Sequence, residues 1–206
     1  LDLESLVEEK SEEKDDTKEL VIDDIGQFKN KDFAYYLETR GSIYSKSEIL
    51  GIGIYDGEKG YFINKDNIEK YREIFSSDVL KFTYDYKKSL VVLNSLDVKF
   101  KNVSFDTMIA AYLLDYVVKD DISFVARSFD YQLPIYEDTY GTDKRPIEVE
   151  EERLKEICCQ KAQFIYETRK RLLKELSDDG ELDLFNNIEM PLAEVLADME
   201  ITGIKV

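Results

Sequence analysis

Any catalysis by this chain would have to rest on carboxylates, lysines, tyrosines or two adjacent cysteines, because its 206 residues include no histidine. Imidazole is the commonest general base and a common metal ligand, so serine–histidine–aspartate triads and histidine-containing zinc sites are excluded. Cys158 and Cys159 are neighbours in an expected long helix. We interpret them as helix packing in a reducing cytosol, with a vicinal redox switch as the alternative. The carboxylates are therefore the first candidates for chemistry.

Two acidic residues stand at the ends of expected strands. Glu38 ends the aromatic-rich stretch Phe33–Glu38, and Asp85 follows the stretch Val79–Tyr84. Carboxylate oxygens are the ligands that hard divalent cations prefer. Both residues also have an ordinary interpretation as polar residues at strand ends, and Asp85 is a natural N-cap for the helix that follows it.

The composition indicates one α/β domain with a strongly acidic surface. Apolar residues make up 43% of the chain, which is normal for a globular protein, and the formal net charge is −17. Such a surface repels a phosphate backbone, so if the domain belonged to an enzyme that acts on DNA, it would not be expected to hold the DNA. We find no signal peptide and no apolar run of about 18 residues, so we expect a cytoplasmic protein without membrane contact.

The apolar pattern predicts strands first and helices later. After one or two helical turns near residues 23–30, we expect strands over Phe33–Glu38, Ile49–Tyr55, Gly60–Ile63, Val79–Tyr84 and Asn102–Phe105. We expect helical segments over Asp66–Phe75, Asp85–Leu96, Asp106–Val117, Ser123–Ser128, Glu148–Ser177 and Leu182–Glu200, with a loop over residues 133–146. This order predicts an α/β fold in which helices flank a mixed five-stranded sheet.

Three stretches resemble the 3′–5′ exonuclease domain of Bacillus-type bacterial DNA polymerase I, a family A polymerase. Leu80–Leu90 resembles its second exonuclease motif, Asn102–Asp115 a strand-to-helix segment, and Leu182–Val206 the helix that leads toward the polymerase domain. The resemblance implies an RNase H-like (DEDD exonuclease) fold. It also implies three parts: an acidic flanking segment (1–20), an exonuclease-like domain (21–181) and a connecting helix (182–206).

Active members of that family hold two Mg²⁺ or Mn²⁺ ions with four carboxylates and use a tyrosine to orient the attacking water. On the first strand of this chain, Tyr36 replaces the family's aspartate and Glu38 keeps its glutamate. Asp85 keeps the aspartate of the second motif. On the late helix, Ile157 and Lys161 replace the tyrosine and aspartate of the third motif. The resemblance therefore implies a vestigial site that has lost two of its four carboxylates.

No other register restores the missing ligands. Asp-x-Glu occurs at residues 2–4, 56–58, 179–181 and 198–200, but never on the first strand, and Tyr-x-x-x-Asp occurs only at 116–120, too early in the chain. No acid lies between Glu156 and Glu167. We therefore expect no metal and no other cofactor in this domain. Mg²⁺ is expected only in the polymerase domain, which this chain does not contain.

These observations predict a non-catalytic exonuclease-like domain that supports the polymerase domain of the same chain in DNA replication and repair. The parent protein would be a DNA-directed DNA polymerase, monomeric, cytoplasmic and nucleoid-associated in a bacterium, and DNA would reach this domain only through it. Two alternatives stay open. One is an active DEDD-type 3′–5′ exonuclease with rearranged ligands, and the other is an acidic protein-interaction domain.

A further hypothesis concerns the position of the Lys161 side chain relative to Glu38 and Asp85. Without metal ions, Glu38 and Asp85 would repel each other in a partly desolvated cleft. An ammonium at position 161 could neutralise one or both of them, which requires its nitrogen within about 4 Å of a carboxylate oxygen. The alternative is a rotated helix with Lys161 in solvent. We interpret Tyr36 as sheet packing, with its hydroxyl bonded locally.

Overall fold

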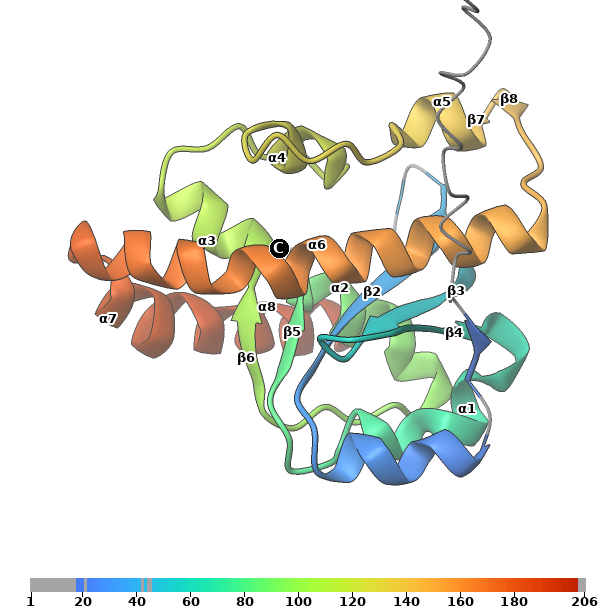
Figure 1. The fold of residues 1–206 in the computed structure, drawn as a ribbon, viewed down its shortest axis with the longest axis horizontal. Coiled ribbons are helices and arrows are strands. Elements are labelled where there is room, and N and C mark those ends of the chain that lie inside the picture. The colour runs from blue at the N-terminus through green and yellow to red at the C-terminus, as the bar shows by residue number, and fades with distance from the viewer. Residues whose placement is uncertain (1–17, 21, 42, 44–45, 204–206) are drawn as a thin grey trace, which may run out of the picture.

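A computed structural model describes residues 18–20, 22–41, 43 and 46–203. Six strands form one mixed sheet in the order β1-β4-β3-β2-β5-β6 (Figure 1). The strands are β1 (Lys18–Glu19), β2 (Phe33–Arg40), β3 (Glu48–Tyr55), β4 (Gly60–Asn64), β5 (Lys81–Thr83) and β6 (Val103–Asp106). All five expected strands are present, and the sixth, β1, pairs parallel with β4. It lies in the expected flanking segment, of which residues 1–17 are outside the described residues, as are 204–206 at the other end of the chain.

Helices cover both faces of the sheet. They are α1 (Ile68–Tyr71), α2 (Tyr86–Leu93), α3 (Thr107–Leu113), α4 (Ser123–Arg127), α5 (Tyr136–Tyr140), α6 (Glu151–Asp178), α7 (Leu182–Leu184) and α8 (Met190–Ile201). Shorter 3₁₀ turns are η1 (Ile22–Lys29), η3 (Lys65–Asn67), η4 (Arg72–Ile74) and η5 (Asn94–Leu96), and η6 (Phe185–Glu189) is a π-helical turn. The long helix α6 crosses the sheet, as Figure 1 shows. None of the helices in the described part of the chain is long and apolar enough to span a membrane.

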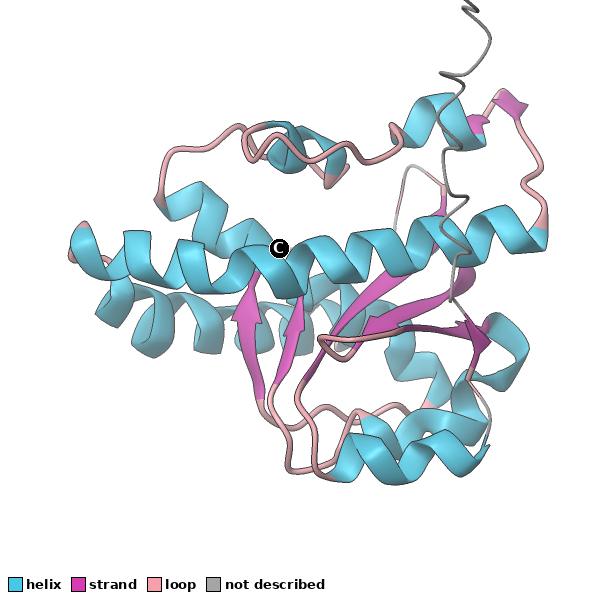
Figure 2. Cartoon of the chain, viewed as in Figure 1, coloured by secondary structure: helices cyan, strands magenta, loops and turns pink. Residues whose placement is uncertain are grey.

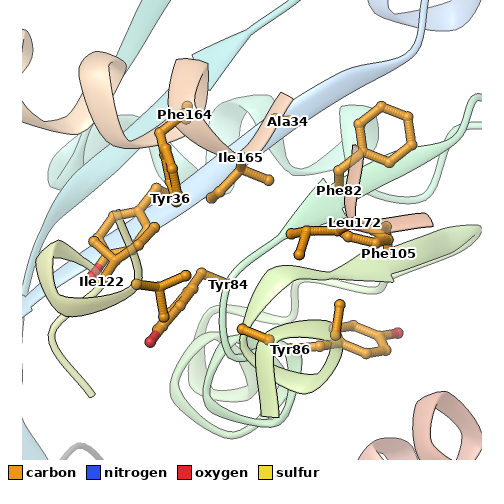
Figure 3. Close-up of a cluster of buried hydrophobic side chains, with 14 of the residues drawn as sticks. Ala34, Tyr36, Phe82, Tyr84, Tyr86, Phe105, Ile122, Phe164, Ile165 and Leu172 are labelled. Carbon is orange, nitrogen blue, oxygen red and sulfur yellow. The ribbon is translucent and has the colours of Figure 1, made fainter. Parts of the chain in front are cut away.

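The central strand β2 is buried along nearly its whole length because both of its faces pack. Its even-numbered residues Ala34 and Tyr36 join a core that includes Phe164 and Ile165 of α6, and Figure 3 shows these side chains together. Its odd-numbered apolar residues belong to a second core with the end of α2. A strand between two helical layers has no solvent face, so any polar residue on it must find a partner inside the protein.

Close contact between α6 and the sheet depends on a glycine in β3. A β-carbon added at Gly53 would lie 2.2 Å from the backbone oxygen of Cys158 in α6. Cys158 and Cys159 are both buried and neither is in a disulfide, and the Cys159 Sγ donates a hydrogen bond to the Tyr61 backbone oxygen. Gly53 thus lets the long helix approach the sheet backbone, which brings the side chains of α6 down to the level of β2.

Several expected elements differ from the structure. The helix expected over Asp106–Val117 ends at Leu113, and the segment expected over Asp66–Phe75 is divided among η3, α1 and η4. The expected loop over residues 133–146 contains α5 and a two-stranded hairpin, β7 (Gly141–Thr142) and β8 (Arg145–Pro146), which Figure 2 distinguishes from the loops. These pieces are too short to show a periodic pattern. The expected single helix over residues 182–200 is interrupted by η6, where the Met190 N–H bonds to the Phe185 oxygen. Pro191 follows and has no N–H to donate, which favours a widened turn at this position.

Candidate functional site: a cleft of carboxylates and lysines

A cleft of about 210 Å³ opens at the end of β2. Four parts of the chain form it: β2 and the turn after it, the start of α2, the loop before α4, and α5. Its walls are polar and aromatic, and they consist of Tyr36, Glu38, Thr39, Gly41, Asp85, Lys88, Asp120, Asp121 and Tyr136. Three of the five residues singled out from the sequence, Tyr36, Glu38 and Asp85, therefore lie in one place.

Glu38 is a buried acid on the central strand. Its side chain is 2% exposed, and the pairing of β2 with β3 shifts by one register between Glu38 and Thr39. Such an irregularity bends a strand and changes the direction of its side chains, and it is common beside active sites. Two residues earlier, Tyr36 is also buried and projects to the same face of the sheet. A buried carboxylate of this kind requires a charged partner.

That partner is Lys161. Its Nζ lies 2.5 Å from Glu38 Oε2, and its side chain is 1% exposed. The distance confirms the geometry expected for a lysine that neutralises an acid of the cleft, and it rules out a solvent-exposed Lys161. The ammonium also lies 4.8 Å from the centroid of the Tyr36 ring. Ile157, one turn earlier on α6, is buried and apolar, so it offers no hydroxyl to orient a water molecule.

Asp85 keeps its place at the end of β5 and caps α2. Its Oδ1 accepts a hydrogen bond from the Lys88 N–H at 3.1 Å, and its backbone is left-handed with φ 62°. A second aspartate fixes this conformation, because Asp106 accepts hydrogen bonds from the backbone N–H groups of Asp85 and Tyr86. Burial raises the pKa of Asp85, and it raises that of Asp106 to about 7, with help from the nearby Asp85 charge. Asp85 is therefore the N-cap of α2, as one interpretation of the sequence proposed, and it also lines the cleft.

Sequence reasoning missed Lys88, a second cation of the cleft. It lies three residues after Asp85 on the first turn of α2 and lines the cleft. Burial lowers the pKa of the Lys88 ammonium, and the carboxylates of Glu38 and Asp85 act in the opposite direction. The spacing from Asp85 could have indicated it, since residues three apart share a helix face.

The sequence also gave no sign that the chain before α4 and the start of α5 reach the cleft. Asp121 accepts hydrogen bonds from the backbone N–H groups of Ser123 and Tyr136, both at 2.9 Å. The Tyr136 hydroxyl in turn accepts one from the Gly41 N–H. Asp120, the neighbour of Asp121, also lines the cleft. It belongs to the Tyr-x-x-x-Asp sequence at 116–120, which lies too early in the chain to match the third motif. The tyrosine of that sequence, Tyr116, bonds to Glu175 instead.

These residues do not fit a pair of divalent ions. Two cations held close together need several free carboxylates to offset their mutual repulsion. Glu38 is engaged by Lys161, and both oxygens of Asp121 accept backbone hydrogen bonds, which leaves Asp85 and Asp120. Within the described ranges, no group of three or more histidine, cysteine, aspartate and glutamate side chains is arranged to hold a metal ion.

Comparison with known sequences gives bacterial polymerases. DNA polymerase I of Bacillus subtilis is 35% identical over 181 residues, which cover 84% of this chain and 20% of the relative. DNA polymerase I of Streptococcus pneumoniae is 32% identical over 193 residues, which cover 90% of this chain and 22% of the relative. The chain thus spans about a fifth of the length of these curated relatives.

Comparison with solved structures gives the same fold. The polymerase I of M. smegmatis, solved with a DNA primer-template and dNTP, superposes with a TM-score of 0.72 at 17% identity, over 92% of this chain and 32% of that one. RNase D of Escherichia coli, an exoribonuclease, superposes with a TM-score of 0.68 at 14% identity, over 92% of this chain and 50% of that one. The fold is therefore RNase H-like. Residues 35–168 match the family described as the ribonuclease H-like domain of DNA polymerase I, and the chain belongs to that family.

Proposed function

We propose that this chain is a non-catalytic 3′–5′ exonuclease-like domain of a DNA polymerase I. The observation that carries the proposal is the buried ion pair between Lys161 and Glu38, at 2.5 Å. This pair holds the positive charge of Lys161 beside Glu38, an acid that an active relative would use as a metal ligand. A divalent ion would have to displace this ammonium and would leave it buried without its partner, which costs several kcal/mol.

The nuclease assay tests this proposal directly. The purified domain is incubated with 3′-labelled and 5′-labelled single-stranded DNA in Mg²⁺ and then in Mn²⁺. Its matched control is the double variant Glu38→Ala/Asp85→Ala, which lacks both remaining acids of the family pattern. We expect the two proteins to be indistinguishable. Stepwise 3′–5′ cleavage that the double variant loses would contradict the proposal, whereas cleavage that both proteins share comes from a contaminant.

We further propose that the domain supports the polymerase portion of a longer chain in DNA replication and repair, as a monomer in the bacterial cytoplasm. Helix α8 supports this role because it is apolar on two sides. One side of α8 is buried on the domain through Met190, Ala193 and Ala197, and the other exposes Leu192 and Val195, while Ile188 of the preceding turn η6 is exposed as well. The exposed residues are four and three positions apart and so form one stripe. A helix that is apolar on both sides is typical of one packed between two bodies.

The role of this stripe is tested in the longer chain that includes the polymerase portion. Leu192→Asp/Val195→Asp should lower the melting temperature of that chain and make the junction sensitive to limited proteolysis. In the isolated domain the same change should have little effect, because both side chains are already exposed there. A loss of equal size in both proteins would contradict packing of the polymerase portion on this stripe. DNA is proposed to bind through the polymerase portion, since the net charge here is −17.

One observation favours a second candidate, an active exonuclease with rearranged ligands. Asp120 lines the cleft together with Glu38 and Asp85, so a third carboxylate stands near the two that the family pattern retains. If this candidate holds, Asp120→Ala should abolish metal-dependent cleavage. The exposed Asp138 of α5 provides the matched control, because Asp138→Ala should leave any cleavage unchanged.

A further inference from the structure

The ammonium of Lys161 is enclosed on more than one side. Besides the Glu38 carboxylate at 2.5 Å, the ring of Tyr36 lies 4.8 Å from Nζ and the ring of Tyr140 lies 6.0 Å from it, measured to the ring centroids. Both tyrosines are buried, with 5% and 2% of their surface exposed. One acid and two aromatic rings thus surround a charge that water barely reaches.

Each of these groups attracts a cation for its own physical reason. The carboxylate contributes a charge-assisted hydrogen bond, which is among the strong ones in proteins. The face of an aromatic ring carries negative electrostatic potential and attracts a cation within about 6 Å of its centroid, more strongly when the site is desolvated. Cages of aromatic rings are the means by which proteins recognise quaternary ammonium ligands.

We infer that Glu38, Tyr36 and Tyr140 form a binding site for a primary alkylammonium ion, and that the side chain of Lys161 occupies this site as an internal ligand. Two of the three departures from the family pattern, Tyr36 on β2 and Lys161 on α6, then act as one unit. Lys161 supplies the cation, and Tyr36 supplies part of the cage that holds it. This inference goes beyond the proposed function, because the cage formed by Glu38, Tyr36 and Tyr140 can bind the ammonium whether or not the domain cleaves DNA.

The site can be reached from solution when the internal ligand is shortened. Glu38 and Tyr36 also line the open cleft of about 210 Å³. Lys161→Ala removes the atoms from Cγ to Nζ, which correspond to n-propylammonium. The variant therefore leaves the cage empty and offers a small amine both the space and the partners that the lysine had.

Chemical rescue of Lys161→Ala tests the inference by thermal unfolding. We expect the variant to melt about 6–20 °C below the wild type, because one partner of a buried pair is gone. Added n-propylammonium chloride should raise its melting temperature by several degrees, saturably, while leaving the wild type unchanged. n-Propanol and sodium chloride at the same concentrations are the controls. Equal recovery in either control, or no recovery in the amine, would overturn the cage.

A double-mutant cycle tests the same inference if Lys161→Ala does not fold. Tyr36→Leu removes a ring of the cage, and it should lower the melting temperature more in the wild type than in a Lys161→Met background, where no ammonium remains. Tyr36→Phe keeps the ring and should behave like the wild type. Tyr84→Leu removes a neighbouring ring, 6.5 Å from Tyr36 between centroids, and should cost the same in both backgrounds. Equal losses for Tyr36→Leu in both backgrounds would overturn the cage.

Discussion

Two lysines are fully buried among the residues that the structure describes, and they differ in the groups that accept hydrogen bonds from their ammonium. Lys81 begins β5 and is 0% exposed. Its Nζ donates to three backbone carbonyl oxygens, those of Ser77 at 2.7 Å, Val79 at 2.9 Å and Lys101 at 2.8 Å. Lys161 donates instead to the carboxylate of Glu38. One ammonium is therefore held by neutral dipoles and the other by a full opposite charge.

This difference separates a structural lysine from one that compensates an acid. Lys81 joins the turn before β5 to the loop before β6, and removing its charge leaves only neutral groups behind. Lys161 joins α6 to β2, and removing its charge leaves a buried carboxylate. An unpaired buried charge costs more than unpaired carbonyl groups. The two sites should consequently respond differently to the same kind of substitution.

The largest effect is expected at Lys161. Lys161→Ala should lower the free energy of unfolding by about 3–5 kcal/mol, because Glu38 is left buried without its partner. Lys170→Ala on the same helix is the matched control, since Lys170 is exposed, and it should change stability by no more than about 0.5 kcal/mol. Denaturant unfolding measures both. Similar losses in free energy of unfolding for Lys161→Ala and Lys170→Ala would contradict the claim that Lys161 compensates a buried acid.

The next prediction concerns removal of both charges of the Lys161–Glu38 pair. In Glu38→Gln/Lys161→Met no charge is left behind, so the double variant should be more stable than Lys161→Met alone. The coupling between the two positions follows from the cycle of single and double variants. Strictly additive losses would mean that Lys161 and Glu38 do not depend on each other.

A smaller effect is expected at Lys81. Lys81→Met should lower the free energy of unfolding by about 1.5–3 kcal/mol, the range for hydrogen bonds that involve a charged group. Lys99→Met, at an exposed lysine two residues before Lys101, is the control and should be nearly neutral. Equilibrium unfolding of these variants measures whether the loss in free energy of unfolding is smaller for Lys81 than for Lys161. If Lys81→Met were more destabilising than Lys161→Ala, the distinction between dipoles and charge would be wrong.

The smallest effect concerns pH. Burial lowers the pKa of Lys81 from its ordinary 10.5 to about 8. Between these values the unfolded chain holds a proton that the folded chain has released, so the contribution of this group to the free energy of unfolding rises with pH. The stability advantage of the wild type over Lys81→Met should therefore widen between pH 8 and pH 10, by about 1–2 kcal/mol. An advantage that shrinks over this range would contradict the sign.

The parts of the fold that could be read from the sequence are those with strong local signals. The apolar runs over β2 and β3 and the long pattern of α6 are sufficient to place the sheet and the helix that crosses it. Once the resemblance fixes the motifs, Glu38 and Lys161 follow residue by residue. Their contact at 2.5 Å is the one expected if Lys161 occupies the place of the third-motif aspartate.

The rest of the cleft depends on packing between distant segments. Asp120 comes from the loop before α4 and Tyr136 from the start of the short helix α5, and neither segment has a periodic pattern. Hydrogen bonds to Asp121 and from Gly41 hold Tyr136 in place. Asp120 was set aside because of its place in the chain, but position along a chain does not fix position in space. Tyr140 was not predicted either, because it lies on a five-residue helix inside an expected loop.

The central claim is that Lys161 holds the charge that metal ions hold in an active relative, and a calorimetric titration of the purified domain with Mn²⁺ tests it most directly. Glu38→Ala/Asp85→Ala serves as the matched protein without the two retained acids. We predict no saturable Mn²⁺ binding in the wild type beyond what the double variant shows, because the ion pair leaves too few free carboxylates. Saturable binding of two Mn²⁺ ions that the double variant loses would contradict the account.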